Sequence, residues 1–425
     1  MINLSKQPII YVTRDIERAL GLSLDTPGYY IISNATDFAK CVQKKHSNNV
    51  FLIDEKEQLD TWELLQHPKI QEILQNVPSP NLGEGQPARQ ALPGMVGGGE
   101  VKIVVFKPTP QIESLCNQNG WNLLNPFSTL ANKAEEKISQ IEWLGDLKKY
   151  LPDYQVKLCK DIEWNGKRFV LQFNRSHTGS GTTLVDDEHI LNEIKQKFPN
   201  REARIAPYIE GPLFTNNNVV TAAKTLLGNI SYQITGLEPF TDRPFATIGN
   251  DWGVVKKLLS PKQTDQYKQI ATDVGKKFQE QGWKGLFGID VVLDEKTSTL
   301  YLLEINARQP ASTTYESQLQ RSEIKDQGSR ITTFEAHLAT LLDIDLSNSE
   351  LITIDDGAQI ISRITNHVTH INLDTIINLE KEGFNTIVYN NTQLGSDLLR
   401  VQSKKSLMKN HAELNEVGQV ILNFL

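Results

Sequence analysis

The segment that decides the fold is residues 285–312, which read GLFGIDVVLDEKTSTLYLLEINARQPAS. It contains two apolar runs, residues 288–293 and 299–305, joined by the polar linker DEKTS. This pattern predicts two antiparallel strands connected by a short turn. Asp290 lies in the first strand and Glu304 near the end of the second, and side chains that oppose each other across an antiparallel pair share one face. We therefore expect both carboxylates on the same surface.

Asn306 and Arg308 continue this face, because every second residue of a strand points the same way. Asp290, Glu304 and the carboxamide oxygen of Asn306 would supply the oxygen ligands that Mg²⁺ prefers. The guanidinium of Arg308 would hold an anionic group beside the metal. The alternative is a solvated hairpin with ordinary surface charges. The apolar run LYLL directly before Glu304 argues against that alternative.

Two further segments, together with the hairpin, resemble the ATP-grasp superfamily, which includes D-alanine–D-alanine ligase, biotin carboxylase and glycinamide ribonucleotide synthetase. Residues 176–182, SHTGSGT, lie where that family keeps a mobile glycine loop over the γ-phosphate. Residues 203–209, ARIAPYI, are expected to form a strand. At its end, residues 206–211, APYIEG, resemble the family's hinge, whose backbone reads the adenine edge. Taken alone, the first segment is equally a hairpin turn and the second a plain strand end, but their order matches the family.

The resemblance also implies phosphate contacts. Asn132 and Lys133 resemble the Asp-Lys pair that opens a helix in the family, although Lys133 is equally interpreted as a solvated lysine. The strand before the loop reads FVLQFNR, so Gln172 stands where a lysine is usual, and Arg175 is an alternative source of charge. The expected nucleotide-binding residues are Lys133, Gln172, Arg175, His177, Thr178, Gly179, Ser180, Gly181, Thr182, Pro207, Tyr208, Ile209 and Glu210. The expected metal ligands are Asp290, Glu304 and Asn306, and Arg308 is the expected catalytic residue.

The fold class that we expect is α/β and α+β. Short apolar runs that alternate with helical stretches predict a doubly wound parallel sheet in the first 125 residues. An ATP-grasp fold with two subdomains would follow over residues 126–345, and a small α+β region over residues 346–425. Residues 77–100 are rich in glycine and proline and lack apolar periodicity, so we interpret them as a flexible insertion. The expected strands of the first domain are residues 8–13, 29–33, 50–53 and 102–106.

Composition excludes several classes of protein. The chain has 425 residues, of which 39% are hydrophobic and 22% charged, as is typical of a globular protein. The formal net charge of -7 argues against a nucleic-acid partner. No apolar run approaches the eighteen residues that a membrane span needs, so we expect no membrane partner and a cytoplasmic location. The three cysteines include no CxxC pair, which argues against a disulfide framework or a zinc site.

The resemblance implies an ATP-dependent carboxylate–amine ligase that makes an amide or peptide bond through an acyl phosphate and releases ADP and phosphate. Its cofactors would be ATP and Mg²⁺, with two ions expected and Mn²⁺ as a substitute. An amino acid or a peptide is the expected carboxylate or amine substrate. The sequence does not decide whether the protein forms a homodimer. One alternative is an ATP-binding pseudoenzyme or regulatory module, which Gln172 supports. Another is a carboxylase of the biotin-carboxylase kind, against which stands the lack of a Met-Lys-Met segment.

Overall fold

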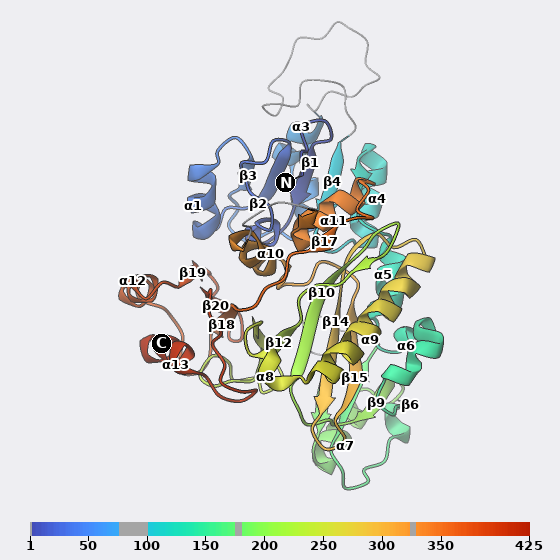
Figure 1. The fold of residues 1–425 in the computed structure, drawn as a ribbon. Helices are drawn as coiled ribbons and strands as arrows, with labels where there is room; N and C mark the ends of the chain where they lie inside the picture. The colour runs from blue at the N-terminus through green and yellow to red at the C-terminus, as the bar shows by residue number, and fades with distance from the viewer. Residues whose placement is uncertain (1, 76–100, 175–180, 324–328) are drawn as a thin grey trace, which may run out of the picture.

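The computed structural model describes residues 2–75, 101–174, 181–323 and 329–425. The expected insertion at residues 77–100 falls outside these ranges. Three principal β-sheets organise the described residues: a parallel sheet near the N-terminus, a small antiparallel sheet and a large antiparallel sheet. The N-terminal sheet and the small sheet lie at opposite ends of the large sheet (Figure 1). The expected mixed α/β class with a parallel N-terminal sheet is confirmed.

The N-terminal sheet is parallel throughout and has the strand order β3-β2-β1-β4-β5. Its central strands are buried on both faces, as expected for a sheet that helices cover from two sides. The strands are β1 (Ile9–Val12), β2 (Tyr29–Asn34), β3 (Val50–Ile53), β4 (Lys102–Val105) and β5 (Asn122–Leu123). The helices between them are η1 (Ile16–Ala19), α1 (Asp37–Lys45), α2 (Thr61–Gln66), α3 (Pro68–Gln75) and α4 (Pro110–Asn119).

The small sheet has the order β6-β9-β7-β8 and is antiparallel. Along β7, buried Phe169, Leu171 and Phe173 alternate with half-buried Val170 and Gln172. The buried set packs in one apolar cluster with residues of α7, so the opposite face carries the half-buried set. The elements of this region are β6 (Gln155–Leu158), η3 (Cys159–Asp161), β7 (Phe169–Phe173), β8 (Thr182–Val185), α7 (Glu188–Lys197) and β9 (Glu202–Pro207).

The large sheet runs in the order β15-β14-β10-β12-β13-β18-β20-β19, with β11 paired to β10, and every described pairing in it is antiparallel. Strand β18 pairs with β13, so the sheet continues across the boundary that we expect at residue 346. Its strands are β10 (Leu213–Val220), β11 (Thr225–Leu226), β12 (Ser231–Thr235), β13 (Thr247–Asp251), β14 (Gly285–Asp294), β15 (Thr299–Asn306), β18 (Ala358–Arg363), β19 (Asn385–Val388) and β20 (Asp397–Ser403).

Helices cover the large sheet and join it to its neighbours. The longest described helix, α9 (Pro261–Glu280), begins with a capping box in which the Ser260 side chain accepts from the backbone amide of Gln263. The others are α5 (Ser128–Glu135), α6 (Ser139–Leu144), η2 (Gly145–Tyr150), α8 (Val255–Leu258), α10 (Thr313–Ser322), α11 (Thr333–Leu341), α12 (Leu373–Lys381) and α13 (Glu416–Phe424). A short parallel pair, β16 (Arg330–Ile331) and β17 (Glu350–Leu351), flanks α11. No helix in the described part of the chain is long and apolar enough to cross a membrane.

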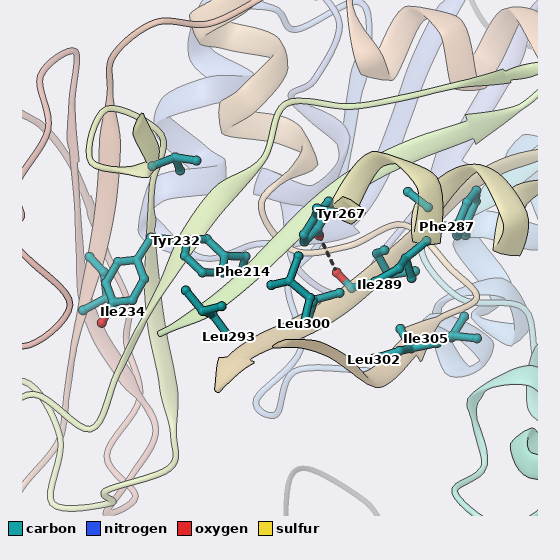
Figure 2. Close-up of a cluster of buried hydrophobic side chains, with 14 of the residues drawn as sticks. Phe214, Tyr232, Ile234, Tyr267, Phe287, Ile289, Leu293, Leu300, Leu302 and Ile305 are labelled. Carbon is teal, nitrogen blue, oxygen red and sulfur yellow. Dashed lines mark hydrogen bonds between the residues drawn. The ribbon is translucent and has the colours of Figure 1, made fainter. Parts of the chain in front are cut away.

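The main apolar core lies between the large sheet and α9. Figure 2 shows side chains of β10, β14 and β15, among them Phe214, Ile289 and Leu302, gathered under this helix. Tyr267 of α9 is also buried there, and its Oη donates to the carbonyl oxygen of Ile289 at 3.2 Å (Figure 2). This hydrogen bond satisfies the one polar group that the tyrosine brings into the core. The core therefore fixes the strand pair that carries Asp290 and Glu304.

Candidate active site

The β14–β15 hairpin places the expected metal ligands side by side. Asp290 is the direct cross-strand partner of Glu304, and Gly288 is the partner of Asn306. The next pair on the other side is Val291 with Leu302, which leaves Leu303 as an extra residue in β15. A bulge of this kind bends a strand and redirects the side chains beside it. The two carboxylates thus face the same surface at the point where the strand pairing is interrupted.

Asp290 is held by two amide groups. Its Oδ1 accepts from Nε2 of Gln233 at 2.7 Å, and its Oδ2 accepts from Nδ2 of Asn306 at 3.2 Å. Burial and, next, the negative charge of Glu304 raise the pKa of Asp290 above its usual value. A nearby cation would relieve this repulsion between the two carboxylates.

Glu304 faces Lys137, a residue that was not among those expected from the sequence. Nζ of Lys137 lies 3.0 Å from Oε1 of Glu304, and the Lys137 side chain is only 12% exposed. Burial raises the pKa of Glu304, but the charges of Lys137 and Arg308 outweigh it, and the net direction is downward. Lys133, the lysine that we expected at this site, lies exposed on α5 one helical turn earlier. The sequence held no signal for Lys137, because α5 ends at Glu135 and the position of the turn that follows depends on packing.

Arg308 ends a chain of charged groups that reaches back to the N-terminal sheet. Its NH1 donates to Oδ1 of Asn306 at 2.6 Å and to Oε1 of Glu135 at 2.7 Å. The other carboxylate oxygen of Glu135 accepts from Nζ of Lys107, which lies just beyond β4. Burial lowers the pKa of Arg308, but the charges of Glu135 and Glu304 outweigh it and the net shift is upward. The sequence did not indicate Glu135 and Lys107, because both precede Arg308 by more than 170 residues.

The donor groups of this surface fit a divalent cation. Asp290 and Glu304 supply hard carboxylate oxygens, and Asn306 adds a carboxamide oxygen. In the present arrangement that oxygen accepts from Arg308, so it would have to turn toward the ion. No group of three or more His, Cys, Asp or Glu side chains with metal-binding geometry is found in the described ranges. Because Mg²⁺ takes about six oxygen ligands, two carboxylates would leave coordination positions free for oxygens of a bound ligand.

Only part of the expected nucleotide-binding set lies in the described ranges. Arg175, His177, Thr178, Gly179 and Ser180 fall outside them. Gln172, in β7, donates from Nε2 to Oγ1 of Thr182 across the strand pair at 3.3 Å. The carbonyl oxygen of Gly181 accepts from the amide of Phe173 at 2.9 Å.

Strand β9 ends at Pro207, inside the expected hinge at residues 206–211 and two residues before the end of the strand that we expected. Tyr208 lies between the guanidinium of Arg168, 5.2 Å from its ring centroid, and the ring of Phe245 at 5.9 Å. Glu210 forms ion pairs with Arg168 and, at 3.6 Å, with Lys296. Ile209 is half-buried beside them. Pro207, Tyr208 and Glu210 line a cavity of about 540 Å³.

Comparison with known proteins identifies a family for the central part of the chain. Residues 134–312, which include the small sheet and the β14–β15 hairpin, match the family model described as ATP-grasp domain. This stretch of the chain is an ATP-grasp domain. The match includes Lys137, Gln172, the hinge and Arg308. No curated protein sequence matches the chain.

Solved structures with this fold cover nearly the whole chain. One is the N5-carboxyaminoimidazole synthetase of Staphylococcus aureus complexed with ADP, with 13% identity over 98% of this chain and 95% of that one, and a TM-score of 0.60. Another is an L-amino acid ligase from Bacillus licheniformis, with 12% identity over 98% and 96% and a TM-score of 0.61. The biotin carboxylase domain of a Hydrogenobacter thermophilus 2-oxoglutarate carboxylase gives 13% identity, coverage of 94% and 86%, and a TM-score of 0.61. At these identities the likeness concerns the fold, which extends beyond the ATP-grasp domain to both ends of the chain.

Proposed function

We propose that the protein is an ATP-dependent carboxylate–amine ligase that forms an amide or peptide bond through an acyl-phosphate intermediate and releases ADP and phosphate. The observation that carries this proposal is the pair of facing carboxylates, Asp290 and Glu304, with Arg308 and Lys137 beside them. A divalent cation and two basic groups on one surface suit phosphoryl transfer, in which positioning and electrostatics supply most of the catalysis. A Mg²⁺ ion, when bound, would neutralise charge on the nucleotide phosphates.

The side chains around Arg308 support a role in holding the substrate carboxylate. Glu135 and Asn306 both accept hydrogen bonds from NH1 of Arg308. These bonds fix the guanidinium, and its other N–H groups are available to bind an anion. A carboxylate held there would lie beside the metal surface, where its oxygen can attack the γ-phosphorus. The amine that follows would displace phosphate from the acyl phosphate. Arg308 would then stabilise the negative charge that develops on the carbonyl oxygen.

An amino acid or a peptide is the substrate class that we propose. The ligase from Bacillus licheniformis is named for L-amino acids, and its fold covers 98% of this chain. The Staphylococcus aureus synthetase was solved with ADP, which supports the proposal of an adenine nucleotide in the ATP-grasp domain.

The test is release of ADP and phosphate from Mg-ATP in the presence of pooled amino acids, dipeptides and other small carboxylates. Products are then identified by mass spectrometry. We expect release to require both a carboxylate and an amine, and the product to have the summed mass of the two less one water. Release that needs bicarbonate in place of an organic carboxylate would instead identify a carboxylase. ATP binding without release in every pool would identify a non-catalytic ATP-binding module and would refute the ligase.

A further inference from the structure

Arg204 is a cation on the face of the small sheet that does not carry the apolar cluster. In β9 it is the cross-strand partner of Gln172 in β7 and of Val156 in β6. Its sequence neighbours Ala203 and Ile205 belong to the apolar cluster packed against α7. Because strand side chains alternate between faces, Arg204 and Gln172 point together to the opposite side.

The guanidinium of Arg204 is buried, and two of its three nitrogen atoms have no hydrogen-bond partner among the described residues. The residue is 1% exposed, and neither Nε nor NH1 has a hydrogen-bond partner within the described ranges. The ring of Tyr154 lies with its centroid 5.8 Å from the guanidinium carbon. Burial lowers the pKa of Arg204 to about 10, so the group is still charged at neutral pH. A buried charge without a partner is costly, and such groups normally meet an opposite charge or a set of acceptors.

The position of Arg204 along its strand relates it to the nucleotide site. It precedes Pro207 by three residues, which places it roughly 10 Å from the start of the hinge at the usual rise of a strand. At the other end of the same strand pairing, Ala203 faces Phe173, whose amide donates to Gly181. A nucleotide with its base at the hinge would extend its phosphates in this direction.

We propose that Arg204 binds the phosphate chain of the nucleotide, in place of a cation on β7, where Gln172 is neutral. The inference rests on the proposed function, because it requires a nucleotide between the hinge and the metal surface. A phosphate would supply the acceptors that Nε and NH1 lack, and the planar fork of a guanidinium matches two phosphate oxygens at once. Tyr154 covers this fork, so its ring must turn away when the phosphates bind.

The test compares ligands with and without phosphates in the full-length protein by isothermal titration calorimetry with Mg²⁺. The ligands are a non-hydrolysable ATP analogue, ADP and adenosine. In Arg204→Met we expect the affinity for both phosphorylated ligands to fall roughly 10- to 100-fold, as for loss of a charged hydrogen bond. The affinity for adenosine should stay within about twofold. Arg204→Lys, which keeps the charge and loses the fork, should show a smaller loss.

Two further variants sharpen the comparison. Lys197→Met is the matched control, since Lys197 is an exposed cation of α7, the helix that packs against the other face of the same sheet. It should bind all three ligands as the native chain does. Gln172→Lys in the Arg204→Met background should restore much of the affinity for ADP, because it returns a cation to the neighbouring strand.

The outcomes separate this inference from the proposed function. If the native protein binds ADP and Arg204→Met binds it equally well, the role of Arg204 is refuted and the ligase proposal stands. If the native protein binds no adenine nucleotide, both fail. Equal losses for adenosine and ADP, together with a lower melting temperature, would assign Arg204 a structural role under Tyr154 and overturn the inference. In support of it, the melting temperature of ligand-free Arg204→Met should not fall, because the substitution removes an unpartnered buried charge.

Discussion

Glu304 lies between a like charge and an opposite charge. It faces the carboxylate of Asp290 across the strand pair, and its Oε1 lies 3.0 Å from the ammonium of Lys137. Glu304→Gln keeps the shape of the side chain and removes its charge. If Glu304 holds the metal, ATP turnover should fall by about 100-fold or more. The melting temperature should change little, because the side chain is 41% exposed.

The matched control for this prediction is Glu295→Gln. Glu295 lies in the turn of the same hairpin and is exposed, so its amide variant should keep native turnover. Both variants are compared by ADP release at saturating ATP. Turnover near the native rate in Glu304→Gln would show that Glu304 does not hold a metal ion.

His337 gives a prediction about the pH dependence of stability. The imidazole is 3% exposed, its Nδ1 accepts from the amide of Leu286 at 3.2 Å, and burial lowers its pKa from 6.5 to about 3. The unfolded chain therefore binds a proton below pH 6.5 that the folded chain does not. Because of this difference, the unfolding free energy should fall by roughly 2 kcal/mol as the pH is lowered from 7 to 5.

Urea unfolding at a series of pH values measures this effect. His337→Asn keeps an acceptor near Leu286 but does not titrate in this range. The unfolding free energy of this variant should therefore fall much less between pH 7 and pH 5 than that of the native protein, whatever its value at pH 7. A decrease as steep as in the native protein would show that other groups cause it.

At the residue scale, the sequence predicted positions on strands better than positions on helices. Asp290 and Glu304 could be placed on one face because strand side chains alternate with a fixed period of two. The choice between Lys133 and Lys137 depends on how α5 and the chain after it pack against β15. No sequence pattern distinguishes Arg204, because its burial follows from how the strands of the small sheet pack.

At the element scale, the apolar runs predicted four of the five strands of the N-terminal sheet and the β14–β15 hairpin to within a few residues, but not the two-residue strand β5. The extra residue in β15 was not predicted, because a bulge changes the register without changing the apolar pattern. The strand before the hinge ends at Pro207, whereas we expected it to continue to Ile209. A proline lacks the amide that a continuing ladder needs, which explains the earlier end.

Gly211 connects the small sheet to the large one, between β9 and β10. Its φ is 151°, and a methyl group there would lie 1.8 Å from the carbonyl oxygen of Leu293. Gly211→Ala must therefore move backbone at the junction, and we expect a loss of about 2–4 kcal/mol of unfolding free energy. Gly120→Ala is the matched control, because Gly120 has a φ of 68° with nothing within 4 Å of the added carbon.

The control isolates backbone conformation from steric contact. It should cost only about 1–2 kcal/mol, the usual price of a left-handed residue with a side chain. Chemical unfolding of both variants gives the comparison. If Gly211→Ala is no less stable than Gly120→Ala, the backbone at this junction can shift at little cost, and the close contact with Leu293 does not determine stability.

At the scale of the whole molecule, the sequence did not show which segments share a sheet. We expected residues 346–425 to form a small region of their own, but β18, β19 and β20 extend the large sheet. Asp251 of β13 reinforces this connection by accepting from the amides of Leu407 and Met408 at 2.7 and 2.9 Å. Pairings between strands separated by more than a hundred residues leave no periodic signal in either segment.

The N-terminal sheet is joined to the rest of the molecule through α10 and α11. Oη of Tyr11 in β1 donates to Oε1 of Gln309 at 2.6 Å, and Phe334 of α11 is fully buried between Tyr11 and Tyr29. The same apolar cluster contains residues of β1, β2 and α11. The parallel sheet therefore completes its core with side chains from a segment 300 residues later, and we expect both parts to unfold in one transition.

Phe334→Ala tests this dependence. Loss of a fully buried aromatic side chain should lower the unfolding free energy by about 3–5 kcal/mol. Phe127→Ala is the matched control, because Phe127 is 77% exposed and its removal should change stability by no more than about 0.5 kcal/mol. Differential scanning calorimetry should give a single, shifted transition in Phe334→Ala, since the two regions share this core. Two separate transitions, with the first assigned to the N-terminal sheet by limited proteolysis, would show that the sheet folds on its own and that the contact at Phe334 only docks it.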